Sequence, residues 1–155
     1  MRSPASPYNA RMSERKRVPI EPGYFTIPER PGERPRLLGS RCRACGEHFF
    51  PRRVVCARCL AQDTEDVVLG PAGTLYTWTY VHFPLFASHR AEHGGYAVGQ
   101  VDLPEGPRVQ SVLSGGPTEF RIGMPMELDL EALRETKEGE DVVIFRFRPV
   151  EPVGA

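Results

Sequence analysis

The chain has 155 residues, enough for one ordinary domain or for one small domain plus a module stabilised by a metal. Its 16 prolines and 15 glycines argue against long helices, and no apolar run approaches the roughly 20 residues that span a bilayer. Residues 1–69 carry 13 Lys and Arg against 8 Asp and Glu, whereas residues 70–155 carry 7 against 12. Any polyanion site is therefore expected in the first part of the chain, and the lack of a signal-peptide pattern predicts a cytoplasmic protein.

Residues 1–36 are predicted to form a flexible N-terminal arm rich in proline and arginine. The first 19 residues are polar and show no hydrophobic periodicity, so we expect them to be disordered. Between Ile20 and Leu38 four prolines prevent a helix of useful length and favour an extended segment. Its apolar residues, such as Tyr24 and Phe25, could pack on the rest of the chain or on a partner, and the sequence leaves both open.

Four cysteines within residues 37–69 give the most specific signal in the chain. Cys42 and Cys45 form one Cys-x2-Cys pair, and Cys56 and Cys59 form a second pair. Two such pairs bring four thiolates together, which satisfies the tetrahedral preference of Zn²⁺ and leaves no open position. Gly46 suits the sharp turn after the second cysteine. We predict a zinc ribbon with one structural zinc ion; a rubredoxin-like iron site or two disulfides are the alternatives.

Residues 70–150 are predicted to form a small β-barrel, with residues 151–155 as a C-terminal tail. Strands are expected at residues 74–83, 96–103, 108–113, 126–130 and 142–147, separated by Gly- and Pro-rich turns. In the fourth strand, Met126, Leu128 and Leu130 are expected to point inward. Five strands with antiparallel neighbours favour a closed barrel of the OB type, because closure removes exposed edges. The predicted fold is therefore mainly β: a four-cysteine zinc ribbon followed by a five-stranded OB-fold barrel.

These segments resemble the OB-fold family known as domain of unknown function 35 (DUF35). The ribbon half is carried by Leu38-Gly-Ser-Arg-Cys-Arg-Ala-Cys-Gly, Phe50-Pro-Arg-Arg and Cys56-Ala-Arg-Cys. The barrel half is carried, in matching order, by Gly73-Thr-Leu-Tyr-Thr-Trp-Thr, Tyr96-Ala-Val-Gly-Gln-Val-Asp and Ile122-Gly-Met-Pro-Met-Glu-Leu.

The resemblance covers residues 24–150 and implies a non-catalytic accessory subunit of a hetero-oligomer. Such a subunit binds a thiolase-fold enzyme (a thiolase, an acyltransferase or a lipid-transfer-protein-type aldolase) and helps to enclose its acyl-CoA substrate. Family members often carry an N-terminal helix before the ribbon, and the proline-rich arm does not resemble one.

Five arginines lie near the cysteines and are candidate contacts to CoA phosphates or to the partner: Arg41, Arg43, Arg52, Arg53 and Arg58. Guanidinium groups bind phosphate well, and CoA carries a diphosphate and a 3′-phosphate. The alternatives are a solvated basic surface or salt bridges to a partner, because isolated surface charges usually contribute little.

Three aromatic residues alternate along the first barrel strand and are expected on one face: Tyr76, Trp78 and Tyr80. They are candidates to face the partner or the substrate, or to pack in the core. A stacking platform for single-stranded nucleic acid is the alternative function, but the acidic balance of residues 70–155 disfavours it.

Residues 89–93 read His-Arg-Ala-Glu-His and match the H-x-x-E-H pattern of one zinc-peptidase class. Pro84 and the glycines at 94 and 95 leave room for about two helical turns, and no third ligand can be identified. We interpret this segment as a loop. All four cysteines are taken by the zinc site, so we expect no catalytic residue and no enzymatic activity of the chain by itself.

Overall fold

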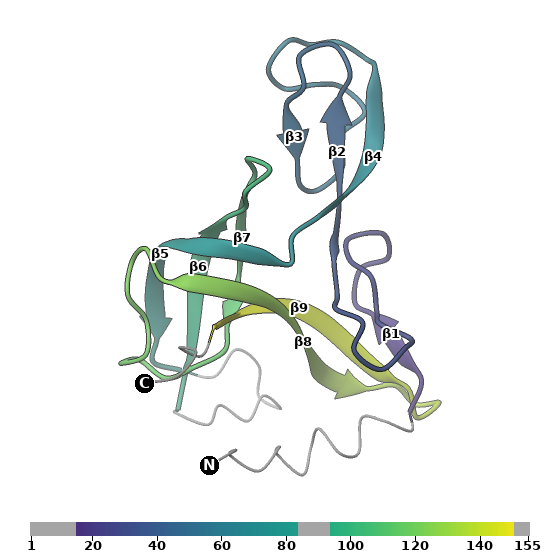
Figure 1. The fold of residues 1–155 in the computed structure, drawn as a ribbon. Coiled ribbons are helices and arrows are strands. Elements are labelled where there is room, and N and C mark those ends of the chain that lie inside the picture. The colour runs from purple at the N-terminus through teal and green to yellow at the C-terminus, as the bar shows by residue number, and fades with distance from the viewer. Residues whose placement is uncertain (1–14, 84–93, 151–155) are drawn as a thin grey trace.

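The computed structural model describes residues 15–83 and 94–150, which form two β-sheets (Figure 1). The larger sheet contains β1 (Arg17–Pro19), β5 (Ala72–Val81), β6 (Tyr96–Asp102), β7 (Arg108–Leu113), β8 (Pro125–Glu135) and β9 (Asp141–Pro149). The smaller sheet contains β2 (Leu37–Cys42), β3 (His48–Phe49) and β4 (Thr64–Leu69). These two ranges contain no helix, and hence none long and apolar enough to cross a membrane.

The larger sheet closes into the predicted five-stranded barrel. Its strand order is β1-β9-β7-β6-β5-β8, and β8 also pairs with β9. All neighbours among β5 to β9 are antiparallel except β7 and β9, which run parallel where Leu113 meets Phe147. The mainly β class and the OB-type barrel are thus confirmed. The last two strands are longer than predicted, because their pairing continues along most of the β8–β9 hairpin.

The barrel interior is filled by inward side chains of every barrel strand. Among the described residues, the largest fully buried apolar side chains are Phe147, Leu37, Leu69, Leu75, Met126, Val101, Val109 and Val143, of which Leu37 and Leu69 come from the ribbon strands β2 and β4. Burying one such side chain contributes about 1.5–3 kcal/mol. In β8, Met126 and Leu128 are buried as predicted, whereas Leu130 is half-buried against the edge of the core.

The arm packs on its own chain. Phe25 is 5% exposed and pairs with Leu37 through an isolated β-bridge. Residues 17–19 form β1, which runs parallel to β9 from Asp141 to Val143. The prediction of disorder up to residue 19 is therefore wrong for residues 15–19, because the start of β9 offers an open edge that β1 covers. Residues 1–14 lie outside the described residues.

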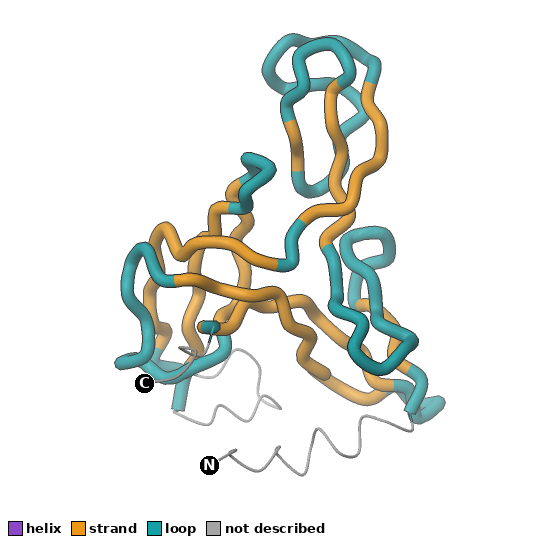
Figure 2. Tube along the Cα trace, viewed as in Figure 1, coloured by secondary structure: helices purple, strands orange, loops and turns teal. Residues whose placement is uncertain are grey.

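An aromatic cluster joins the arm, the ribbon and the barrel. The Phe50 ring of the ribbon lies edge-on to Tyr24 of the arm at 5.9 Å and to Phe145 of β9 at 5.6 Å, measured between ring centroids. Phe25 of the arm also contacts Phe145, at 5.8 Å. Figure 2 shows the arm as mostly loop, running from the barrel edge to the base of the ribbon, which stands away from the barrel.

Candidate metal centre and partner-contacting residues

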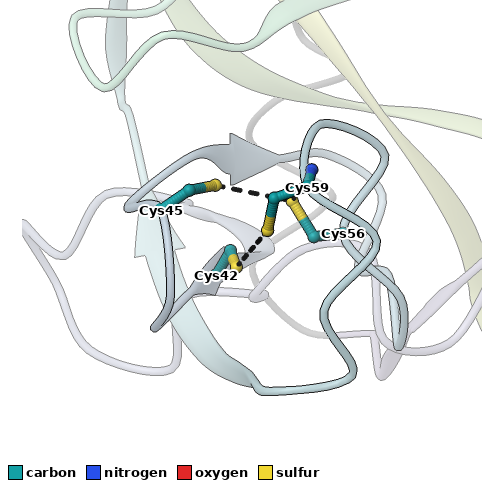
Figure 3. A group of neighbouring side chains, drawn as sticks. All are labelled: Cys42, Cys45, Cys56 and Cys59. Carbon is teal, nitrogen blue, oxygen red and sulfur yellow. Dashed lines mark hydrogen bonds between the residues drawn. The ribbon is translucent and has the colours of Figure 1, made fainter.

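The four cysteine sulfurs converge at the far end of the ribbon (Figure 3). All four thiols are free, and their Sγ atoms lie within 4.8 Å of one another. The Sγ atoms of Cys42 and Cys59 are 3.7 Å apart, and those of Cys45 and Cys56 are 3.6 Å apart. Zn–S bonds of about 2.3 Å in a tetrahedron place the sulfurs about 3.8 Å apart, so the residues fit one zinc ion.

Both knuckles have the same backbone geometry. In the first, the Gly46 N–H donates to the Cys42 carbonyl at 2.8 Å and Gly46 has a φ of 79°. In the second, the Leu60 N–H donates to the Cys56 carbonyl at 3.0 Å and Leu60 has a φ of 65°. Each turn directs its pair of sulfurs toward the other pair.

Backbone amides prepare the Cys56 sulfur to be a thiolate. Burial by itself would raise the pKa of this thiol, but the N–H groups of Cys59 and Arg58, each 3.4 Å from Sγ, lower it. Together with the neighbouring thiols they bring the pKa of Cys56 to about 6. Backbone amides of Glu47 and Ala61 likewise lower the pKa values of Cys45 and Cys59, but burial and the neighbouring thiols raise both pKa values overall. Zinc is bound by thiolates, so of these three cysteines Cys56 is the one whose pKa favours metal binding. With four sulfur ligands the centre is closed, and zinc here supplies folding stability and no open coordination position.

Carboxylates of the same chain neutralise four of the five candidate arginines. The Glu65 carboxylate of β4 accepts hydrogen bonds from the guanidinium groups of Arg41 at 3.2 Å and Arg43 at 3.3 Å. These bonds lower the pKa of Glu65, and the bond from Arg41 has the larger effect. The other two ion pairs join Arg52 to Asp66 and Arg58 to Glu47, each at 3.0 Å. Sequence reasoning missed the pairs of Glu65 and Asp66 because β4 follows the cysteines in the chain but lies beside β2 in the sheet. Glu47, the partner of Arg58, lies between the two cysteine pairs.

Arg53 differs from the other four arginines. Its guanidinium carbon lies 5.7 Å from the centroid of the Phe49 ring, and its backbone N–H donates to the Ser40 hydroxyl. Among the described residues its side chain has no carboxylate partner. The five arginines therefore differ in their surroundings: four form exposed ion pairs, and Arg53 packs on an aromatic ring.

The three aromatic residues of β5 do not share one face. The register between β5 and β6 shifts between Leu75 and Thr77, so Tyr76 is an extra residue on the bulged strand. Tyr76 is 47% exposed, whereas Trp78 and Tyr80 pack against the core. The expectation of a single aromatic face is wrong, because strict alternation does not survive a bulge. Trp78 and Tyr80 pack against the core, which is the alternative that the sequence left open for them.

Sequence reasoning missed a cluster on the outer surface around Tyr76. The Arg108 guanidinium lies 3.2 Å from the centroid of the Tyr76 ring and donates to both oxygens of Asp102, at 2.6 and 3.1 Å. This pairing lowers the pKa of Asp102. Asp102 and Arg108 flank the turn of the predicted hairpin and are directly opposite each other in register. Their opposite charges could have indicated the ion pair from the sequence. The H-x-x-E-H segment lies outside the described residues.

Comparison with known proteins matches both parts of the chain. Residues 31–65 match the family model for the rubredoxin-like zinc ribbon domain of ChsH2, and residues 66–131 match that for the C-terminal OB-fold domain of ChsH2. These features define a class of protein in which a closed four-thiol ribbon is joined to an OB-fold barrel. The chain belongs to the DUF35 family, as the resemblance predicted.

Several relatives cover most of the chain. Benzoylsuccinyl-CoA thiolase subunit BbsA of Thauera aromatica is 31% identical over 119 residues, which are 77% of this chain and 80% of that protein. A DUF35 domain-containing scaffold protein of Methanocaldococcus jannaschii is 31% identical over 124 residues, covering 77% and 85%. Among solved structures, the Ltp2-ChsH2(DUF35) aldolase matches with a TM-score of 0.58 and 31% identity, covering 74% of this chain and 84% of that chain.

Proposed function

We propose that this chain is a non-catalytic accessory subunit that binds a thiolase-fold enzyme and helps to enclose its acyl-CoA substrate. The observation that supports the proposal is the closed metal centre joined to a barrel, in a chain that is similar in sequence to a thiolase subunit and in structure to a chain of an aldolase. Four thiolates leave zinc no position for water or substrate, so the metal serves the scaffold. All four cysteines of the chain belong to that centre, which leaves no thiol as a nucleophile.

Within the proposed complex, catalysis belongs to the partner. The ribbon stands away from the barrel (Figure 1), so it can contact the enzyme at a distance from the barrel. In the proposed complex the barrel covers the thioester. Arg53 is the ribbon arginine best suited to a CoA phosphate or to an acidic group of the partner, because the other four already have carboxylates. Tyr76, the exposed aromatic residue of β5, is the corresponding candidate on the barrel. We place the complex in the cytoplasm.

The test is co-expression of the tagged chain with the thiolase-fold subunits of its own organism, followed by purification, mass spectrometry and size-exclusion chromatography with light scattering. We expect one thiolase-fold subunit to co-purify with the chain at a fixed stoichiometry. Turnover of a CoA thioester should require that subunit. The chain alone should turn over no thioester. Turnover by the isolated chain would overturn the proposal. So would a gel shift of a single-stranded oligonucleotide at physiological salt together with no thiolase-fold partner.

A further inference from the structure

Leu60 occupies a backbone conformation that suits glycine. Among the described residues it is the one non-glycine residue with positive φ, at 65°. In this left-handed region the Cβ of an L-residue approaches the following carbonyl oxygen, which is unfavourable for a bulky side chain. The first knuckle uses Gly46 at the equivalent position, with the same hydrogen bond to the first cysteine of its pair. The fold therefore requires the turn but does not require leucine there.

Packing within the chain does not explain the leucine either. Leu60 is 75% exposed and takes no part in the hydrophobic core. A residue held in a sparsely populated conformation without burying its side chain points to a role outside the folding of its own chain. An exposed aliphatic side chain on a rigid, metal-fixed turn is well suited to enter a pocket of another protein, because little conformational entropy remains to be lost.

Two more exposed aliphatic residues lie in the backbone segment that runs beside the turn of Leu60. Val54 is 79% exposed and Val55 is 42% exposed. The hydrogen bond from the Cys56 N–H to the Ala61 carbonyl, at 2.9 Å, holds the segment before Cys56 beside the segment after Leu60. Val54, Val55 and Leu60 are called the knuckle tip below.

Charge around the knuckle tip indicates what covers it. Residues 52–60 contain three arginines and no acidic residue. Arg52 and Arg58 are paired with carboxylates of the chain, whereas Arg53, next to Val54, has no such partner among the described residues. The complementary surface is an apolar pocket with a carboxylate at its rim. A symmetric contact between two copies of the tip would bring like charges together, which opposes self-association through this surface.

We propose that the knuckle tip is the docking anchor of the ribbon on the thiolase-fold subunit, an inference that rests on the proposed function. Leu60 enters an apolar pocket of that subunit, and Arg53 meets an acidic group at the rim of the pocket. Side chains that fill a pocket near the centre of an interface commonly carry much of its affinity, and arginine is enriched among such residues.

The experiment compares Leu60→Gly and Leu60→Ala with the control Val68→Ala. Val68 is 53% exposed on β4, at the barrel end of the ribbon, so its truncation also removes exposed apolar surface. The probe is the thiolase-fold subunit that co-purifies with the wild-type chain, and affinity is measured by calorimetry. We expect both Leu60 variants to raise the dissociation constant at least about tenfold, which equals about 1.4 kcal/mol, and the control to change it less than about twofold.

Zinc content and melting temperature separate docking from folding. Glycine adopts the left-handed conformation at position 60 without steric strain. The Leu60→Gly variant should therefore keep one zinc per chain and melt no lower than the wild type. Arg53→Gln should weaken binding and reduce its dependence on salt.

Several outcomes would overturn the inference. If no thiolase-fold subunit binds the wild-type chain, the proposed function itself fails. If the subunit binds the wild type and both Leu60 variants equally well, the proposed function stands and the anchor role fails. It also fails if both variants lose zinc, which would make Leu60 a folding residue. It fails as well if Leu60→Gly turns an oligomer of the isolated chain into a monomer, which would make a second copy the occupant.

Discussion

Replacing Phe25 with alanine tests whether the arm is part of the folded core. The Phe25 side chain is 5% exposed, contacts Phe145 edge-on at 5.8 Å and belongs to the main hydrophobic cluster. Truncation of a buried phenylalanine typically costs about 3–5 kcal/mol, of which an aromatic pair contributes about 0.5–1.5 kcal/mol. We take about 3 kcal/mol as the expected loss, because the site lies at the joint between ribbon and barrel and can collapse partly. Against a total stability of about 5–15 kcal/mol this is a large fraction.

The assay is urea unfolding of the zinc-loaded chain, followed by far-UV circular dichroism and Trp78 fluorescence. We expect the midpoint to fall with little change in the slope, and the melting temperature to fall by roughly 10 °C. Phe83→Ala is the matched control: it makes the same chemical change at a side chain that is 65% exposed, and its cost should stay within about 0.5 kcal/mol. A loss below about 1 kcal/mol for Phe25→Ala would refute the reasoning that the arm completes the core.

Three further predictions concern the metal centre and two ion pairs. Cys42→Ser should abolish stoichiometric zinc binding, measured by plasma mass spectrometry, and unfold the ribbon, because Cys42 is fully buried and metal binding is coupled to folding; a normal zinc content would contradict this. Asp102→Asn should cost about 0.5 kcal/mol, a small value because both partners are about two-fifths exposed. Arg108 holds the pKa of Asp102 below 3.8, so this contribution should be constant above that pH and disappear as the pH falls through the folded-state pKa. A pH-independent difference between wild type and variant down to full protonation would contradict this assignment. Glu127→Gln should cost about 1–2 kcal/mol in thermal unfolding, because a carboxylate that is 14% exposed loses its charge between two arginines at 2.6 and 2.8 Å; an unchanged melting temperature would argue against it.

Local patterns were sufficient for the barrel and the metal centre. Strand positions follow from β-branched and aromatic runs between Gly- and Pro-rich turns, and cysteine spacing places four sulfurs together because each Cys-x2-Cys turn fixes its own pair. These signals lie within a few residues of one another in the chain. The predicted fold class and the zinc site could therefore be stated before any tertiary contact was known.

Contacts between distant segments could not be predicted in the same way. The pairing of β1 with β9 joins residues more than 120 positions apart, and nothing in Arg17-Val-Pro19 indicates which edge it covers. The bulge at Tyr76 reverses the faces expected for the residues that follow it, because one extra residue changes the alternation. The in-chain partner of Arg41 follows from the register of β4 against β2, which places Glu65 directly opposite it. Leu60 was overlooked because an exposed leucine is unremarkable until its φ is known.

A ribbon that serves as a docking arm must hold a fixed direction relative to the barrel, and the structure provides this with bonds on several sides of a short linker. Residues 70 and 71 alone separate β4 from β5. The Gly70 N–H donates to the Glu105 carboxylate at 3.1 Å, and Arg36 of the arm donates to the Leu69 carbonyl at 3.2 Å. The aromatic cluster around Phe50 then fills the space between the ribbon base and β9. These contacts come from the arm, the β6–β7 turn and β9, so a change in the direction of the ribbon acts against contacts with three separate segments. Two linker residues alone would not hold the ribbon and the barrel in a fixed orientation. The contacts made by the arm supply the rigidity that a scaffold needs.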